Sequence, residues 1–400
     1  MKILLVHRYF WPDSPPYASI LRSIAEKLAA DGHQVDVLTA QPSYGGTALH
    51  ETAPKSEVKR GVSIERAPLL SESKAQPIRR AVNLALFAAR VLSEIGRRRD
   101  YDVVMAATTP PVLVALASRL ASKMTGAKFV YHMQDIYPEV LGANSGQPLS
   151  VPLRLLRQLD AITTRTADRV VVLSVDMRES LAKRGHGIDH VRLINNFMPD
   201  STHFEANPDE VEIGPMKPNS FQVVFAGNLG KFQGLNVVVD AFHDLNERGI
   251  KSHLVLLGGG AAEHDLRAQA GSLMGETVFF PGRVSQGKAE QVVAISDLAL
   301  VTLNPGVIGT AFPSKTMTYL SCGTPVLAAV EDSSELAQVL RSNEVGASCD
   351  LTAHSIAAEI EKAMFADPVR RDVVRGVANA YASQEVRLPQ WSTLFGELDG

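Results

Sequence analysis

Lys315 stands in the stretch AFPSKTMTYLSCGTPV, residues 311–326, where a cation meets the start of a predicted helix. Pro313 and Ser314 fit the opening of that helix, and Gly323 fits its end. A cation in the first turn is unfavourable toward the helix dipole, which favours anions there. An anion shared by the free backbone N–H groups and the ammonium relieves this conflict. The stretch therefore predicts an anion site built on Lys315, with a plain surface lysine as the alternative.

Three loops of the second half are rich in glycine or asparagine: GNLGKFQG, GGGAAEH and NPGVIGTAFPSK. Each follows a predicted strand, and open parallel sheets bind ligands beyond the carboxyl ends of their strands. One such loop is equally well a tight turn, but three together favour a phosphate-bearing ligand. GNLGKFQG lacks the glycine spacing of the dinucleotide fingerprint, and the chain has no G-x-x-x-x-G-K-[ST] run. These observations argue against a redox enzyme and a P-loop NTPase.

The elements that must position these loops are short apolar runs that alternate with longer helical patterns. Such alternation is typical of parallel sheets with crossover helices. The predicted strands span residues 2–6, 34–39, 103–107, 128–132, 169–173 and 190–194 in the first half, and 222–226, 253–257, 277–280, 298–302 and 326–329 in the second.

A segment rich in Pro, Asn and acidic residues, 195–220, has no long periodic pattern and predicts an interdomain linker. We therefore expect a first domain over residues 1–199, a linker over 200–220, a second domain over 221–382 and a closing C-terminal helix over 383–400.

Composition places the chain among ordinary globular proteins. It has 400 residues, of which 45% are hydrophobic and 21% charged, enough for two domains with their own cores. Cys322 and Cys349 are the only cysteines and suggest neither a disulfide framework nor a zinc cluster. The N-terminus reads as a buried strand rather than a signal peptide. We expect a cytoplasmic protein.

The two halves carry opposite charge. Residues 1–199 hold 26 Lys and Arg against 18 Asp and Glu, a net charge of +8, and residues 200–400 hold 14 against 25, a net charge of −11. The first half therefore suits an anionic partner. The apolar run at 81–96, bracketed by arginines, fits either an interfacial helix on anionic lipid at the inner face of the membrane or an ordinary packed helix. No nucleic-acid partner is expected.

Asp100, Tyr101 and Asp102 resemble the D-x-D metal motif of another sugar-transferase fold. They precede a predicted strand, and so lie at the end of the sheet opposite the ligand loops. We expect no metal site there.

Several ordered motifs resemble those of the retaining GT-B glycosyltransferases of family 4, and within them the WbuB-like N-acetylfucosamine transferases of O-antigen and capsule assembly. The motifs are the stretch at 9–46, HMQDIYPE at 132–139, FAGNLGKFQGL at 225–235, FFPGRVS at 279–285 and PSKTMTYLSCGTPVLA at 313–328. The resemblance implies an α/β protein with two Rossmann-like parallel-sheet domains facing across a cleft. It also implies a nucleotide-sugar donor, used as a substrate and not as a cofactor, in the second domain, an acceptor in the first, and transfer with retention and without a metal.

The chain departs from this family at the donor site. Two family glutamates fall on Thr310 and Thr318, and a hydroxyl cannot hold two ribose hydroxyls as a carboxylate does. The family's Arg and Lys fall on Asn228 and Gln233, so both cations are missing. Lys315, with Lys231, is then the candidate to neutralise a diphosphate.

The expected site residues follow from these motifs. His132 fits a cleft histidine or a core residue, and Asp135 fits a base toward an acceptor hydroxyl or a turn cap. The full set is Lys315, His132 and Asp135 for catalysis; Gly227, Asn228, Gly230, Lys231, Arg283, Ser314 and Thr318 for the donor; and Arg8, Tyr17, Ser19 and Glu139 for the acceptor.

The favoured function is transfer of a sugar, with an N-acetylated amino or deoxy sugar as one candidate, from a UDP-linked donor to a lipid-linked or saccharide acceptor of an envelope polysaccharide or glycolipid. A GT-B module that binds nucleotide or sugar without turnover is the first alternative, because both the glutamates and the cation pair are missing. A GT-B sugar-nucleotide epimerase is the second.

Overall fold

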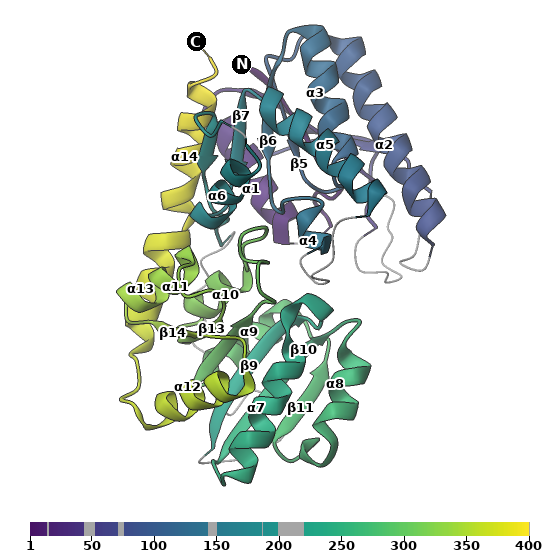
Figure 1. Cartoon of the computed structure of the whole chain (residues 1–400). Helices are drawn as coiled ribbons and strands as arrows, with labels where there is room; N and C mark the ends of the chain where they lie inside the picture. The colour runs from purple at the N-terminus through teal and green to yellow at the C-terminus, as the bar shows by residue number, and fades with distance from the viewer. Residues whose placement is uncertain are drawn as a thin grey trace.

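The computed structural model describes residues 1–13, 16–43, 53–70, 76–142, 150–185, 187–198 and 220–399. These residues form two α/β domains stacked one above the other (Figure 1). Each domain is a sheet with helices on both faces, as the alternating pattern predicts.

The first domain has a sheet of order β3-β4-β2-β1-β5-β6-β7-β8. Its neighbouring strands are parallel, except that β3 and β4 are antiparallel. The strands are β1 (Lys2–Val6), β2 (Gln34–Ala40), β3 (Ser56–Lys59), β4 (Val62–Ala67), β5 (Val103–Ala107), β6 (Lys128–His132), β7 (Arg169–Val172) and β8 (Val191–Leu193). The helices are α1 (Pro16–Ala30), α2 (Pro77–Arg98), α3 (Leu113–Thr125), α4 (Glu139–Gly142), α5 (Val151–Thr166) and α6 (Val175–Lys183).

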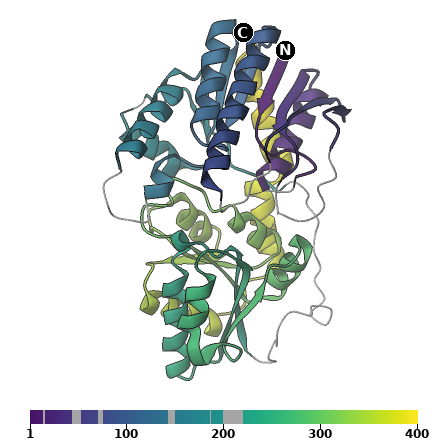
Figure 2. The same ribbon diagram turned by 90° about the vertical axis from the view of Figure 1, so that its right-hand side faces the viewer.

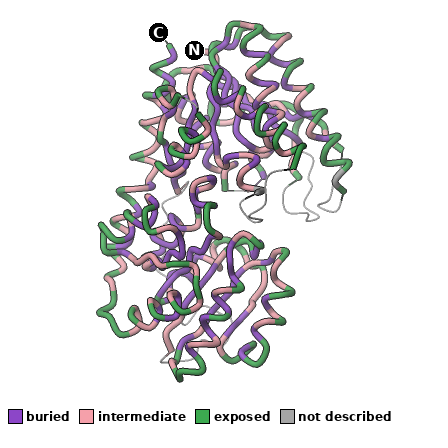
Figure 3. The backbone as a smooth tube through the Cα atoms, viewed as in Figure 1, coloured by how far each residue is buried: buried purple, intermediate pink, exposed green. Residues whose placement is uncertain are grey.

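Strand β1 explains why the N-terminal residues read as a continuous apolar run. Ile3 and Leu5 pack with α1 on one face of the sheet, whereas Leu4 and Val6 pack with α2 and α3 on the other. A parallel sheet covered on both faces needs apolar side chains at every position of its central strands. Buried segments accordingly run through the middle of each domain (Figure 3).

The second domain has a parallel sheet of order β11-β10-β9-β12-β13-β14. The strands are β9 (Phe221–Asn228), β10 (Ser252–Gly259), β11 (Val278–Gly282), β12 (Leu298–Thr302), β13 (Val326–Ala329) and β14 (Gly346–Cys349). The helices are α7 (Leu235–Glu247), α8 (Glu263–Ala270), α9 (Gln286–Ile295), α10 (Lys315–Ser321), α11 (Glu335–Ser342), α12 (Ala353–Phe365) and α13 (Arg371–Ala382), with 3-10 turns η2 (Lys231–Gln233) and η3 (Gly271–Leu273).

The last helix, α14 (Gln384–Gly396), leaves the second domain and returns to the first (Figure 1). Its Trp391, Leu394 and Phe395 are buried in the same core as α1 and β1. The predicted closing helix therefore completes the first domain.

In both sheets the strand order reverses at the central strand, between β1 and β5 and between β9 and β12. Such switch points open a crevice at the carboxyl ends of the strands. The domains also touch there: Asp135 pairs with Ala311 in an isolated antiparallel bridge, and the Ile136 N–H donates to the Thr310 carbonyl at 2.7 Å. Phe312 of the second domain is buried in the core of the first.

The structure adds strands β3, β4 and β14 to those predicted. It places Asp100 and Asp102 before β5. The Lys2 ammonium donates to Asp100, and the Lys2 backbone N–H donates to Asp102. The D-x-D sequence therefore lies away from the crevice, as predicted. Most of the predicted linker, residues 199–219, is outside the described residues.

Candidate active site

Lys315 is the first residue of α10 and points toward the end of β9. Its ammonium donates to Gln233 Oε1 at 2.8 Å and lies 3.8 Å from the centre of the Phe225 ring. No carboxylate among the described residues forms an ion pair with it. Because burial penalises the charged form without such compensation, the pKa of Lys315 falls to about 7. The site thus holds a cation beside neutral groups, and a bound anion would neutralise that cation.

Glycines at the carboxyl ends of β9 and β10 and in the loops that follow let these two segments pack tightly, and Gly227 lies beside this ammonium. A Cβ on Gly258 would lie 1.8 Å from the Gly227 carbonyl oxygen, and one on Gly260 would lie 2.4 Å from that of Leu229. Only glycine allows backbones to approach this closely. The predicted Gly-rich loops therefore pack on each other, and a Cβ on Gly227 would meet the Lys315 side chain at 3.8 Å.

Gln233 is the site residue that the sequence reasoning missed, because it was considered only as the position of an absent cation. Its carbonyl accepts from Thr302 Oγ1 at 2.5 Å, and its N–H donates to the Gly230 carbonyl at 3.1 Å. The side chain is buried and fixed toward Lys315. A polar residue directly before a helix-opening glycine, in a loop already of interest, was the available signal.

The other predicted donor residues lie at the ends of β9 and β11 and before α10, and they differ in exposure. Lys231 and Ser314 are exposed, and Arg283 lies over Gly259, where a Cβ would be 3.1 Å from Arg283 Nε. The Asn228 side chain covers Gly230, with Nδ2 at 2.8 Å from a Cβ built there.

The two threonines at the family's glutamate positions are already engaged. Thr310 is buried and donates to the Val307 carbonyl at 2.9 Å, inside its own loop. Thr318 points toward the first domain, with Oγ1 3.9 Å from Met198 Sδ. In this arrangement neither hydroxyl replaces a ribose-binding carboxylate.

His132 ends β6 and is 1% exposed. Its Nδ1 lies 2.8 Å from the Tyr17 hydroxyl and its Nε2 2.8 Å from Gln134 Nε2, while Trp391 of α14 packs on the ring. Burial, with a smaller effect of His7, lowers the pKa of His132 to about 3, so the ring stays neutral. The geometry favours the packed-histidine alternative, in which any effect on a ligand passes through Tyr17 or Gln134.

Asp135 is a predicted first-domain residue whose backbone meets the Lys315 loop, through its bridge to Ala311. Its N–H donates to Thr108 Oγ1 at 3.3 Å, and no described residue bonds its carboxylate. Burial raises the pKa of Asp135 to about 6. A half-buried carboxylate of this kind can accept a proton near neutral pH.

Glu139, which the sequence assigns to the acceptor side, is held in ion pairs. Its Oε1 accepts from Arg184 Nε at 2.9 Å and pairs with Arg157 Nε at 3.0 Å, so the carboxylate holds α4, α5 and the end of α6 together. An acceptor hydroxyl at this carboxylate would share it with two arginines. Of the other acceptor residues, Tyr17 bonds His132, Arg8 is buried, and Ser19 lies in the first turn of α1 with its carbonyl accepting from Ser23.

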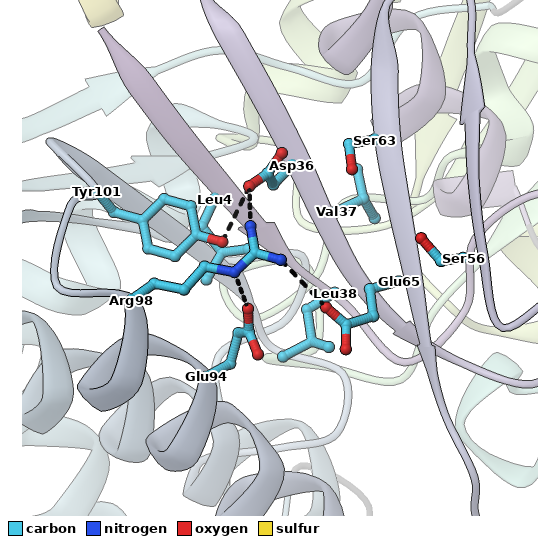
Figure 4. Close-up of a pocket in the computed structure, with 10 residues that line it drawn as sticks. All are labelled: Leu4, Asp36, Val37, Leu38, Ser56, Ser63, Glu65, Glu94, Arg98 and Tyr101. Carbon is cyan, nitrogen blue, oxygen red and sulfur yellow. Dashed lines mark hydrogen bonds and ion pairs between the residues drawn. The ribbon is translucent and has the colours of Figure 1, made fainter.

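A separate hollow lies under the last turns of α2, against β1, β2 and β4 (Figure 4). Arg98 fills its centre and bonds Asp36 Oδ2 at 2.9 Å and Glu94 Oε1 at 2.5 Å, and the Tyr101 hydroxyl donates to Asp36 at 3.0 Å. The charged groups satisfy one another. This cluster fastens α2 to the sheet and is not a ligand site.

Comparison with known proteins relates the chain to glycosyltransferases. Residues 17–196 match the family model described as a glycosyl transferase 4-like domain, and residues 207–378 match the glycosyl transferases group 1 model. The chain is 27% identical over 269 residues to the probable glycosyltransferase WbjE of Pseudomonas aeruginosa, covering 66% of this chain and just under two thirds, 65%, of that protein.

A second relative and a solved structure cover more of the chain. The putative colanic acid biosynthesis glycosyl transferase WcaI of Escherichia coli K12 is 26% identical over 352 residues, or 85% of this chain and 86% of WcaI. HepE of Anabaena, solved in complex with UDP and glucose, superposes with a TM-score of 0.72 at 17% identity, covering 99% of this chain and 100% of that chain. At that identity the superposition establishes the fold alone.

Proposed function

The chain belongs to the GT-B glycosyltransferases, and from this premise we propose that it moves a sugar from a nucleoside diphosphate donor, UDP first among them, to a lipid-linked or saccharide acceptor in envelope polysaccharide or glycolipid synthesis. The transfer proceeds with retention of anomeric configuration and without a metal ion. The donor binds the second domain, and the acceptor enters from the first.

The Lys315 ammonium is the observation that carries this proposal. It lies beside glycine turns and neutral side chains, with Gln233 Oε1 and the Phe225 ring as its contacts. Negative charge builds on a leaving diphosphate as the glycosidic bond breaks, so a fixed cation stabilises the transition state more than the ground state. The bound diphosphate in turn restores the ammonium pKa that burial lowers.

The choice of UDP and of a polysaccharide pathway comes from the relatives. HepE was solved with UDP and glucose, and WcaI is named for colanic acid synthesis. The retaining, metal-free mechanism comes from the motif resemblance. Product stereochemistry, read from the anomeric proton coupling in NMR spectra, tests retention directly.

On the acceptor side, Asp135 supports the proposal. Its carboxylate is half-buried, unbonded among the described residues and joined through the backbone to the Lys315 loop. With a pKa near 6 it is ionised at neutral pH and can orient an acceptor hydroxyl.

A thermal-shift panel of UDP, GDP, TDP and CMP, each with and without EDTA, tests the donor site. A ligand that binds only the folded state stabilises it by RT ln(1 + [L]/Kd). We expect a shift with UDP that EDTA leaves unchanged and that Lys315→Met reduces, followed by transfer of the sugar from the matching UDP-sugars. No shift with any nucleotide, together with no transfer, would contradict the proposal and favour a module without turnover.

A further inference from the structure

Helix α2 carries two apolar stripes, and only one of them packs on other residues that the structure describes. Phe87, Val91 and Ile95 are buried against the sheet. The outward stripe is also apolar and repeats at helical spacing; it consists of Ile78, Ala81, Val82, Ala85, Leu86, Ala89 and Leu92, all exposed. Ile78 is 79% exposed. A helix that is apolar on both sides buries its second side against a further partner.

The apolar surface continues onto the two helices beside α2. Helix α3 packs between α2 and α5, and the three face the same side of the first domain (Figure 2). Leu120 and Met124 of α3 are exposed, as are Val151, Leu155 and Ile162 of α5. We call the outward side of α2, α3 and α5 the three-helix face.

The charges on these helices are mostly positive. They carry ten basic residues, Arg79, Arg80, Arg90, Arg97, Arg98, Arg119, Lys123, Arg154, Arg157 and Arg165, against two acidic ones, Glu94 and Asp160. Both acids are buried and paired with arginines. The net charge of these helices, +8, equals the whole net charge of residues 1–199. The basic excess of the first half is therefore concentrated here.

We propose that the three-helix face docks on an anionic lipid bilayer. Apolar side chains among arginines match an interface whose headgroups are negative and whose interior is apolar. A second copy of this face is excluded as the partner, because two surfaces of the same positive sign repel. Among the described residues no helix is long and apolar enough to cross a bilayer, so the contact is peripheral.

The position of the three-helix face relates membrane docking to acceptor access. Helix α2 follows the carboxyl end of β4, and α5 follows β6 through α4, so both begin on the side of the first domain that faces the second (Figure 1). Ile78, Arg79, Arg80 and Val151 stand in the first turns of these two helices and so belong to that side. Docking there presents the crevice to an acceptor anchored in the same leaflet. This link to a lipid-linked acceptor rests on the proposed function, whereas the docking does not.

Vesicle flotation tests the proposal with the full-length protein. The probes are vesicles of phosphatidylcholine alone and of phosphatidylcholine with phosphatidylglycerol, at low and high salt. We expect binding to the anionic vesicles that salt weakens. Arg79→Gln with Arg80→Gln should lower the partition coefficient about 30-fold, the fold-change that corresponds to about 1 kcal/mol for each basic residue. Ile78→Ser with Val82→Ser and Leu86→Ser should abolish binding.

Matched changes on the second domain, Phe365→Ser and the pair Lys251→Gln with Lys288→Gln, should leave flotation unchanged. Donor-induced thermal shifts should be the same in all variants, which separates docking from the proposed function. Lack of wild-type binding to anionic vesicles overturns the proposal. So does loss of binding in the second-domain variants alone, or concentration-dependent self-association that the triple serine variant removes.

Discussion

The buried Lys315 ammonium lowers the stability of the ligand-free fold, and the same cation can bind a diphosphate. The ammonium is held among neutral groups, where burial lowers its pKa from the ordinary 10.5 to about 7. Between these two values the folded chain binds fewer protons than the unfolded chain, so the stability of the ligand-free protein rises with pH across this window. Gln233, which has no charge, holds the ammonium in place without restoring its pKa.

A pH dependence of donor binding follows. Since a bound diphosphate needs the charged form, the apparent affinity for UDP should fall about tenfold per pH unit above 7 in the wild type. Lys315→Met should remove this dependence and lower kcat/KM about 10²–10³-fold, as loss of a transition-state donor does. Calorimetric titration with UDP at several pH values, with Lys251→Met as the exposed-lysine control, provides the check. An unchanged rate in Lys315→Met would remove the catalytic assignment.

Helix α14 decides the surroundings of His132. Its Trp391 covers the histidine ring, Ser392 donates to Asp31 at 2.6 Å, and Glu397 pairs with Arg169 at 3.1 Å. The last segment of the chain therefore fixes His132 and its surroundings in the first domain.

Trp391→Ala should lower the free energy of unfolding of the first domain by about 3–5 kcal/mol, the cost of a large core truncation. Denaturant titration followed by circular dichroism measures it. Phe365→Ala, at a side chain that is 72% exposed, is the matched control and should change stability little. Equal small effects of both changes would mean that α14 is not part of the core.

The two domains are joined by reciprocal capping of two helices. The Val175 N–H, at the start of α6, donates to Glu335 Oε2 at 2.6 Å, and the Glu335 N–H, at the start of α11, donates to Asp176 Oδ2 at 3.0 Å. The positive, N-terminal ends of α6 and α11 thus lie close together, and the carboxylates of Asp176 and Glu335 lie between them. Tyr381 adds a bond to Glu335. We expect this contact to hold the domains at their observed separation.

Asp176→Asn and Glu335→Gln should each loosen this contact, and a double-mutant cycle should give a coupling of about 0.5–3 kcal/mol. The reason is that both changes remove charge from one shared interface. Small-angle X-ray scattering should show a larger radius of gyration for the double variant. Glu385→Gln, at an exposed acid in the first turn of α14, is the control; an identical scattering curve for all forms would contradict a role in domain spacing.

Patterns local in the sequence predicted much of this molecule. Parallel strands buried on both faces must be apolar at successive positions, so β1, β5 and β9 were visible as runs, and the two-sheet architecture followed from their alternation with helices. The loops that follow the strands, and Lys315 at a helix start, were visible for the same reason. The strands that were missed break the rule: β4 contains Arg66, whose guanidinium is buried against Glu57, and β14 is made of small residues.

Only the tertiary structure decided which distant residues meet. Gln233 lies 82 positions from Lys315, and Trp391 reaches His132 only because α14 returns to the first domain. Glu139 looked free until Arg184 and Arg157 were placed beside it. A sequence pattern reports the period and burial of its own segment, whereas such contacts depend on strand order and on the packing of one element against another. The fold and the cation of the site were therefore predictable, whereas the burial that lowers that cation's pKa was not.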